Sequence, residues 1–122
     1  MPKKILIVDD SLTVRMYHKQ ILHNEGYVCD EAENGMEALE KAQLNTYDLF
    51  LVDVNMPILD GYSFVKRLRE GEGQIAPVVM ISTEAQALDM ELAYQCGASL
   101  YLIKPVKPEE LLINAKILTF SK

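Results

Sequence analysis

The sequence predicts an α/β protein with a three-layer αβα architecture, in which helices cover both faces of a five-stranded parallel sheet. Two observations carry this prediction. Five short apolar runs are spaced along the chain, and a segment with helical periodicity follows each of them. When strands and helices alternate with one helix per connection, a parallel sheet is the simplest packing. The 122 residues show no internal repeat or linker, so we expect one domain over residues 1–122.

The first predicted strand covers residues 5–8, which are all branched or aliphatic and stop at two aspartates. A helix follows whose apolar side chains fall at intervals of three and four residues, the spacing of one helix face. These side chains are Val14, Tyr17, His18, Ile21 and Leu22. Gly26 ends this helix, and a second strand is predicted at residues 27–32.

Asn34 and Glu37 have the spacing of an N-cap residue and its partner, so the second helix is predicted to begin there. The third strand is predicted at residues 49–52, a continuous apolar run of the kind found in buried parallel strands. Asp60 and Gly61 open the third helix.

The fourth strand is predicted at residues 78–81, and Thr83 with Gln86 has the form of a capping box for the fourth helix. The fifth strand is predicted at residues 100–103. Pro108, followed by two glutamates, marks the first turn of the last helix.

The formal net charge of −6 and the pI of about 4.8 argue against binding to nucleic acid or to anionic lipid. A protein partner or a cation fits better. The first apolar run is too short for a signal peptide or a membrane span, so we expect no membrane insertion and a cytoplasmic location. Cys29 and Cys96 are expected to be reduced, buried thiols.

Polar side chains follow four of the predicted strands. Asp9 and Asp10 follow the first, Asp53 the third, Ser82 the fourth and Lys104 the fifth. In open α/β sheets the carboxyl ends of the strands form the ligand-binding edge. Taken singly, the first two aspartates could be helix caps and the lysine could be solvated, but together they form one site.

Three carboxylates at one edge need a counter-ion or a raised pKa, since two of them about 4 Å apart repel by roughly 4 kcal/mol at an effective dielectric of ~20. Oxygen ligands with open coordination positions suit Mg²⁺. An aspartate neutralised by a metal ion, with a lysine beside it, can act as a nucleophile toward a phosphoryl group. The residues therefore predict a magnesium-dependent phosphoryl-transfer site.

Four motifs resemble those of the receiver domains of two-component response regulators. They are IVDDS at residues 7–11, DVNMP at 53–57 with DG at 60–61, IS at 81–82 and GASLYLIKP at 97–105. The resemblance covers nearly the whole chain and is closest to single-domain regulators of chemotaxis. It implies the sheet order 2-1-3-4-5 and a signalling phosphoacceptor that assists its own phosphorylation and dephosphorylation without being an enzyme.

The resemblance also assigns roles to residues. Asp53 would accept the phosphoryl group from the phosphohistidine of a sensor histidine kinase. The Mg²⁺ ligands would be Asp10, Asp53 and the backbone carbonyl of Asn55, with Asp9 acting through water. Lys104 would pair with the phosphoryl oxygens, and the peptide bond before Pro105 would be cis.

In the same family pattern, Ser82 would hydrogen-bond the bound phosphoryl group, and Tyr101 would turn from an exposed to a buried rotamer. Asn55 and Glu84, each two residues after a site residue, would tune how fast the acyl phosphate hydrolyses.

The last two helices each carry more than one apolar stripe, although a core-facing helix needs only one. In the fourth helix Leu88, Leu92 and Cys96 form one stripe, and Met90 and Tyr94 fall on another face. In the last helix one stripe consists of Leu111, Ala115 and Leu118, and a second of Ile113, Ile117 and Phe120. We predict an effector-binding surface on these helices and the last strand, bordered by Met90, Tyr94, Tyr101, Ile113 and Ile117.

Other functions are compatible with parts of the sequence. An FMN carrier of the flavodoxin type would need a phosphate-binding loop where Asp9 and Asp10 stand. An Asp-nucleophile phosphohydrolase needs a second aspartate two residues after the nucleophile, and Asn55 occupies that position. Within the regulator class we expect a single-domain product, monomeric or weakly dimeric on phosphorylation. A chemotaxis or motility role, a phosphorelay intermediate and a receiver cut from a longer regulator stay open.

Overall fold

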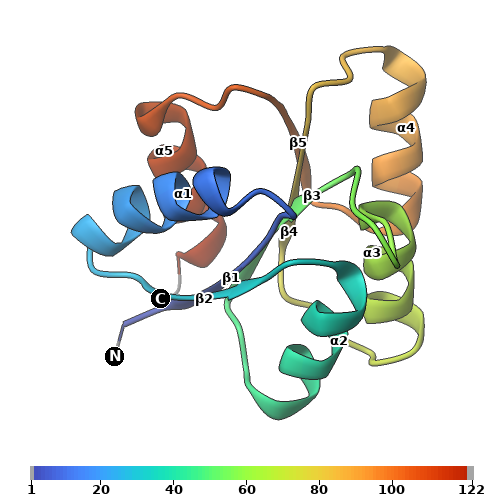
Figure 1. The fold of residues 1–122 in the computed structure, drawn as a ribbon, viewed down its shortest axis with the longest axis horizontal. Coiled ribbons are helices and arrows are strands. Elements are labelled where there is room, and N and C mark those ends of the chain that lie inside the picture. The colour runs from blue at the N-terminus through green and yellow to red at the C-terminus, as the bar shows by residue number, and fades with distance from the viewer. Residues whose placement is uncertain (1, 121–122) are drawn as a thin grey trace.

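The computed structural model describes residues 2–120 and shows five parallel strands between two layers of helices (Figure 1). The strand order is β2-β1-β3-β4-β5, so β1 and β3 are neighbours at the centre of the sheet and β2 and β5 are its edges. The predicted αβα architecture and sheet order are confirmed.

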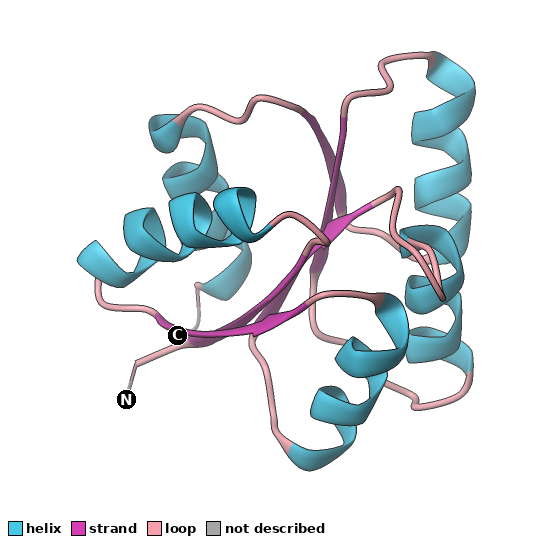
Figure 2. Cartoon of the chain, in the orientation of Figure 1, coloured by secondary structure: helices cyan, strands magenta, loops and turns pink. Residues whose placement is uncertain are grey.

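Each strand is followed by one helix. The strands are β1 (Lys4–Val8), β2 (Val28–Ala32), β3 (Leu49–Asp53), β4 (Val78–Ser82) and β5 (Leu100–Ile103). The helices are α1 (Leu12–Asn24), α2 (Gly35–Leu44), α3 (Gly61–Glu70), α4 (Ala87–Cys96) and α5 (Pro108–Thr119). Asp53 and Ser82 thus end their strands, one residue later than the apolar runs predicted. Figure 2 shows how strands and helices alternate along the chain.

Alternate residues of each central strand enter two separate cores. In β1, Leu6 packs in the core under α2, α3 and α4, whereas Ile5 packs in the core under α1 and α5. In β3, Phe50 packs in the core under α2, α3 and α4, and Leu49 packs in the core under α1 and α5. Because both faces are covered, these strands read as continuous apolar runs.

The N-terminus of α1 is capped by Ser11, whose Oγ accepts a hydrogen bond from the N–H of Val14 at 3.3 Å. Asp9 and Asp10 are therefore not needed as caps, and Oδ1 of Asp9 instead accepts a hydrogen bond from the N–H of Ser11 at 2.9 Å. Asn34 and Asp60 cap α2 and α3 as predicted, through bonds to the N–H groups of Glu37 and Ser63.

The predicted capping box at Thr83 is wrong. α4 begins only at Ala87, its N-cap residue Gln86 makes no side-chain hydrogen bond, and Thr83 is exposed. The N–H of Glu84 is bonded instead to the hydroxyl of Ser82 at 3.0 Å. This local turn competes with the helix and delays its start.

The two apolar stripes predicted for α4 do not mark its core face. Leu88 and Leu92 are exposed, and the helix turns Ala93 and half-buried Met90 toward the core. Cys96 is half-buried, whereas Cys29 is buried as predicted. None of the helices within residues 2–120 has the length and apolar character that a bilayer crossing requires.

Candidate functional site

Three aspartates converge where β1 and β3 end side by side. Val8 pairs with Val52 in the sheet, so Asp9, which follows Val8, and Asp53, which follows Val52, leave neighbouring strands at the same level. The carboxylates of Asp9, Asp10 and Asp53 each offer an oxygen within 4.8 Å of the others. Asp9 and Asp53 are buried and Asp10 is exposed, so the group opens to solvent on one side only.

Lys104 reaches this group from the end of β5. Its Nζ lies 3.1 Å from Oδ2 of Asp9 and 3.2 Å from Oδ1 of Asp53. Burial works to lower the pKa of Lys104, but the hydrogen bonds and charges of the two aspartates outweigh it, so that the pKa is raised. The lysine stays charged. The Lys104–Pro105 peptide bond is cis, which matches the expectation for this position.

The pKa of Asp53 is raised to about 6, first by burial and then by the neighbouring charge of Asp9, with Lys104 acting in the opposite direction. Three carboxylates and one ammonium leave a formal charge of 3 − 1 = 2 negative units in a half-enclosed site. This excess is the amount that one divalent cation would neutralise, and oxygen donors of this kind suit Mg²⁺.

Gly61 allows the chain after Asp53 to fold back on itself. A Cβ at residue 61 would lie 2.4 Å from the carbonyl oxygen of Asp53 and 2.9 Å from Cα of Val54. The N–H of Gly61 also donates to the carbonyl of Val54 at 2.8 Å. Only glycine permits this approach, which anchors the start of α3 against the end of β3.

The loop between β3 and α3 contains a strained residue. Ile58 has a φ of 70°, and the N–H of Leu59 donates to the carbonyl of Pro57 at 2.7 Å. This is a γ-turn with positive φ, a rare and strained conformation for a β-branched residue. The Ile58 side chain is 79% exposed, and Asn55 in the same loop is exposed too.

Ser82 is buried at the end of β4, and the loop that follows it connects the site to Tyr101 on β5. The Tyr101 hydroxyl donates to the carbonyl oxygen of Glu84 at 2.9 Å. Tyr101 is only 7% exposed, so the structure contains the inward rotamer. Its predicted place on the effector-binding surface is therefore wrong, because the ring lies under the β4–α4 loop.

Tyr62, in the first turn of α3, was missed by the sequence analysis. Its hydroxyl donates to the carbonyl oxygen of Asp89 at 3.2 Å and so joins α3 to α4. Burial raises the pKa of Tyr62 to about 12, and neighbouring Tyr101 adds to the effect. The sequence signal that could have revealed this residue is its position directly after the Asp60-Gly61 pair.

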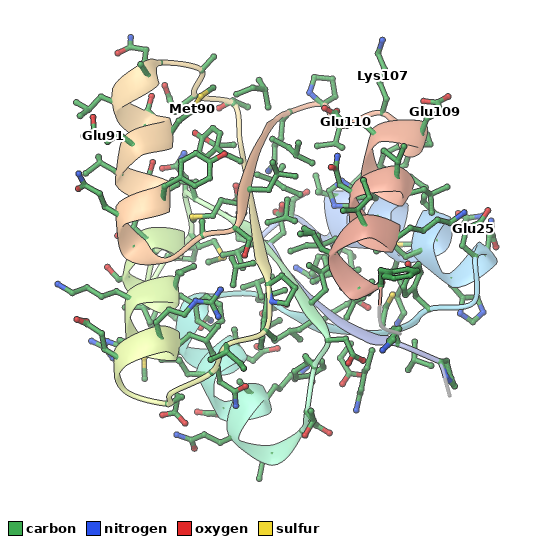
Figure 3. All side chains as sticks on the ribbon, turned by 180° about the vertical axis from the view of Figure 1, so that it is seen from behind. Glu25, Met90, Glu91, Lys107, Glu109 and Glu110 are labelled. Carbon is green, nitrogen blue, oxygen red and sulfur yellow. The ribbon has the colours of Figure 1, made fainter. Side chains whose placement is uncertain are left out.

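The remaining residues of the predicted effector surface lie on α4 and α5, the helices on either side of β5 in Figure 3. Tyr94 on α4 is 47% exposed, and Ile113 and Ile117 on α5 are 58% and 63% exposed. Met90 is half-buried against the core. The two stripes of α5 divide as predicted, since Leu111 and Ala115 are buried. The stripes of α4 do not, and its exposed Leu92 lines a hollow with Lys66 and Arg69 of α3.

Buried Arg15 on α1 was also missed, because arginine is normally expected in solvent. It occupies the buried line of α1 together with His18 and Leu22, at spacings of three and seven residues. Those spacings were the signal that could have revealed it.

This fold and site define the receiver class of signalling domains. Residues 5–116 match the family model described as the response regulator receiver domain, and the chain belongs to this family. It is 35% identical to the transcriptional regulatory protein ResD of Bacillus subtilis over 94% of the chain and 47% of ResD. It is 41% identical to the sensor protein EvgS of Escherichia coli over 87% of the chain and 9% of EvgS.

Solved structures give the same result. The chemotaxis protein CheY4 of Vibrio cholerae superposes with a TM-score of 0.91 and 35% identity, covering 97% of this chain and 99% of that one. A CheY-like receiver domain protein from Methanospirillum hungatei gives a TM-score of 0.91 at 29% identity, covering 98% and 94%. The chain spans about half or less of the curated relatives above, but nearly all of these single-domain structures.

Proposed function

We propose that Asp53 is the phosphoacceptor of this receiver domain and takes a phosphoryl group from the phosphohistidine of a sensor histidine kinase. The observation that carries the proposal is the position of Asp53, buried at the end of a central strand with Lys104 at 3.2 Å and two further carboxylates beside it. Asp9 shares this burial and these neighbours, but its Oδ1 accepts a hydrogen bond from the N–H of Ser11 at 2.9 Å and its Oδ2 pairs with Lys104 at 3.1 Å, so both of its oxygens are engaged.

The three carboxylates fit a Mg²⁺ ion in number, charge and ligand type. Asp10, Asp53 and the backbone carbonyl of Asn55 would hold the ion, with Asp9 acting through water. Bound Mg²⁺ supplies charge neutralisation for the oxygens of the incoming phosphoryl group. It also favours the ionised form of Asp53, whose pKa is otherwise raised to about 6.

The reaction is a displacement at phosphorus. A carboxylate oxygen of Asp53 forms a bond to phosphorus while the bond from phosphorus to the imidazole nitrogen breaks, and that nitrogen keeps the electron pair and is protonated. The product on this chain is an acyl phosphate. Lys104 already stands beside Asp53 and pairs with the phosphoryl oxygens, so most of the catalytic effect is positioning and electrostatic stabilisation.

The phosphoryl group adds a charge of about −1.5 to −2 beside the β4–α4 loop. Ser82 would then donate its hydroxyl to a phosphoryl oxygen, and the bond that its Oγ accepts from the N–H of Glu84 would couple this contact to the β4–α4 loop. The Tyr101 hydroxyl, bound to the carbonyl of Glu84, would move with that loop. Asn55 and Glu84 are exposed near the site, where they would tune access of water to the acyl phosphate.

The signal would be read by an effector protein on the α4-β5-α5 face. Tyr94, Ile113 and Ile117 are the exposed apolar residues of this face, and Met90 borders it. Since the similar solved structures include the chemotaxis protein CheY4 of Vibrio cholerae, a role in chemotaxis or motility is our first choice. A phosphorelay intermediate and a receiver segment of a larger regulator are the alternatives. The single-domain organisation, oligomeric state and cytoplasmic location stay predictions.

The decisive experiment is labelling with acetyl phosphate and MgCl₂, followed by intact-mass spectrometry. The wild type is expected to gain one phosphoryl group transiently, whereas Asp53→Asn is expected to gain none. Adding EDTA is expected to abolish the label. Equal labelling of wild type and Asp53→Asn would overturn the assignment. Ile113→Lys and Ile117→Lys serve as controls, because the exposed α5 stripe does not touch the site.

The same experiment separates the receiver from an Asp-nucleophile phosphohydrolase. That enzyme would need an acid two residues after Asp53, and the amide of Asn55 cannot donate and recover a proton. We therefore expect a stoichiometric phosphoprotein and no steady turnover of p-nitrophenyl phosphate. Continuous release of nitrophenol that depends on Asp53 would favour the hydrolase.

A further inference from the structure

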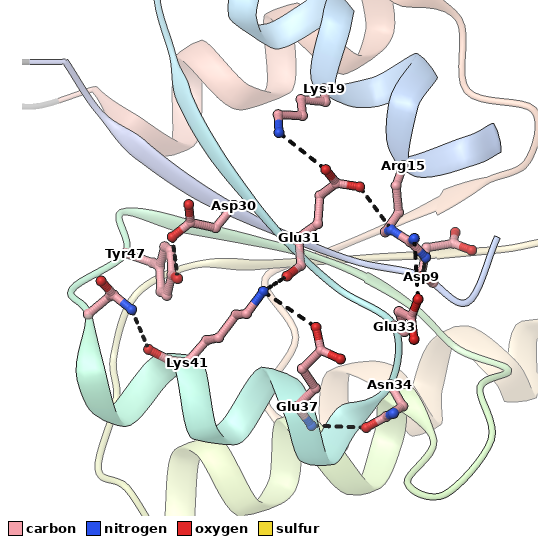
Figure 4. A network of polar contacts seen from close by, with 11 residues as sticks. Asp9, Arg15, Lys19, Asp30, Glu31, Glu33, Asn34, Glu37, Lys41 and Tyr47 are labelled. Atoms are coloured by element: carbon pink, nitrogen blue, oxygen red, sulfur yellow. Dashed lines mark hydrogen bonds and ion pairs between the residues drawn. The ribbon is translucent and has the colours of Figure 1, made fainter. Parts of the chain in front are cut away.

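Arg15 is a buried cation beside the turn between β1 and α1 that carries Asp9 and Asp10, called the acidic turn below. Its side chain is 7% exposed, and Nη1 donates to the backbone carbonyl oxygen of Asp9 at 2.7 Å (Figure 4). The guanidinium therefore contacts the main chain of a predicted metal-site residue from behind, on the side away from the carboxylate.

The other edge of the guanidinium is held by acidic residues at the end of β2. Nε donates to Oε1 of Glu31 at 2.9 Å, and Nη2 lies 3.7 Å from Oε1 of Glu33. Glu31 is held in turn by Lys19 through its other oxygen at 3.2 Å. Arg15 is thus a rigid bridge from β2 to the acidic turn.

The main chain of Asp9 is anchored to β2 at both of its polar groups. Its N–H donates to the carbonyl of Ala32 at 3.1 Å, and its carbonyl reaches Glu31 through Arg15. The bond to Ala32 fixes the peptide plane between Val8 and Asp9, and the bond from Arg15 fixes the plane between Asp9 and Asp10. That plane sets the directions in which both carboxylates leave the strand.

Charge alone gives the opposite expectation. A guanidinium behind the acidic turn repels an approaching cation, so its electrostatic effect on Mg²⁺ binding is unfavourable. If Arg15 acted only through its charge, its removal would tighten Mg²⁺ binding. If it acts by orienting Asp9 and Asp10, its removal would weaken binding. The two roles therefore predict effects of opposite sign.

We propose that Arg15 and Glu31 form a positioning pair that orients the Asp9–Asp10 turn for Mg²⁺. The inference rests on the proposed function of that turn as a metal site. Arg15 touches neither the ion nor the phosphoryl group. It acts through the backbone of Asp9, in the way that outer residues orient the ligands of other metal sites.

The test is isothermal titration calorimetry of Mg²⁺ binding to Arg15→Gln and Glu31→Gln. Arg15→Gln is expected to bind Mg²⁺ about tenfold more weakly than wild type, the usual effect of losing an outer-shell partner. Glu31→Gln is expected to weaken binding in the same direction but less. The double variant is expected to be no weaker than Arg15→Gln alone, because the two residues act as one unit.

Lys19→Gln is the matched control. It removes a positive charge that contacts the same carboxylate of Glu31 but makes no contact with Asp9. Its Mg²⁺ affinity is expected to stay within about twofold of wild type, since an exposed ion pair contributes little. If Arg15→Gln fails to fold by circular dichroism, Arg15→Lys decides the question, because it keeps the positive charge but loses the planar fork that joins Asp9 to Glu31 and is expected to weaken Mg²⁺ binding.

Unchanged or tighter Mg²⁺ binding by Arg15→Gln, or by Arg15→Lys where that variant decides, would overturn the positioning role. A wild-type protein that takes up no Mg²⁺ at millimolar concentration would instead overturn the proposed metal site, so the two failures are distinguishable.

Discussion

Nζ of Lys104 lies 3.2 Å from Oδ1 of Asp53, although the two residues come from different strands at separate positions in the sheet. The same nitrogen lies 3.1 Å from Asp9. One ammonium thus stands between two buried carboxylates and faces the open side of the site. This arrangement makes Lys104 the side chain most directly placed to stabilise a phosphoryl group arriving at Asp53.

Lys104→Gln is expected to slow labelling of Asp53 by acetyl phosphate by about tenfold or more, because a preorganised charge is lost from the transition state. Lys104→Arg is expected to restore little, since the planar guanidinium does not fit the position of an ammonium. Exposed Lys107→Gln in the same loop is the control and is expected to label like wild type. Labelling rates come from intact-mass spectrometry over time, and an undiminished rate in Lys104→Gln would contradict the assigned role.

Asp53→Asn is expected to stabilise the metal-free protein at neutral pH. The folded pKa of about 6 lies above the ordinary value of 3.8. Between these values the folded state keeps a proton that the unfolded state has lost, so wild-type stability falls as the pH rises from about 4 to above 6. Asparagine does not ionise, so the variant does not lose stability in this way as the pH rises. The gain is at most about 3 kcal/mol at pH 7.5, from a shift of about two pKa units.

Urea denaturation in the presence of EDTA at several pH values measures this difference. The stability advantage of Asp53→Asn should disappear near pH 4, where Asp53 is protonated in the folded state. An advantage that is constant from pH 4 to 7.5 would show that ionisation of Asp53 is not its cause.

Gly61→Ala is expected to destabilise the fold by about 2–3 kcal/mol, because the new methyl group meets backbone atoms of Asp53 and Val54 that cannot move freely. Gly73→Asn is the control: its φ of 64° suits asparagine, and no atom lies within 4 Å of the added Cβ. Midpoints of urea denaturation compare the two variants. Equal stability of Gly61→Ala and wild type would mean that the β3–α3 junction is softer than its contacts indicate.

Ile58→Asn is expected to stabilise the protein by about 1 kcal/mol, since asparagine tolerates the positive φ that strains a β-branched residue. Ile75→Asn replaces another isoleucine, which is 93% exposed and has no positive φ, and should change stability by less than about 0.5 kcal/mol. Thermal denaturation of both variants provides the comparison. Loss of stability in Ile58→Asn would show that the exposed side chain, and not the backbone, dominates at this position.

The fold and the convergence of the acidic residues were predictable because they follow from periodicity and topology. Once residues 5–8 and 49–52 are parallel neighbours, Asp9 and Asp53 must leave the sheet together. This inference needs no knowledge of side-chain packing. Lys104 joins them by the same rule from the end of β5.

The failures concern choices that only tertiary packing makes. α4 contacts the core through small Ala93, and the more apolar Leu88 and Leu92 face outward, so hydrophobicity alone selected the wrong face. Tyr101 could have lain on either side of its strand end. Its burial depends on the Glu84 carbonyl, which is set by a loop that does not follow helix-capping rules.

Tyr101 and Tyr62 both bind α4 and the loop before it through main-chain oxygens, those of Glu84 and Asp89. Every residue type carries such an oxygen, so the side chains at 84 and 89 can be exchanged without breaking either bond. The surface side chains of this region can therefore change to suit different partners, while the two tyrosine hydrogen bonds that hold α4 and its preceding loop are kept.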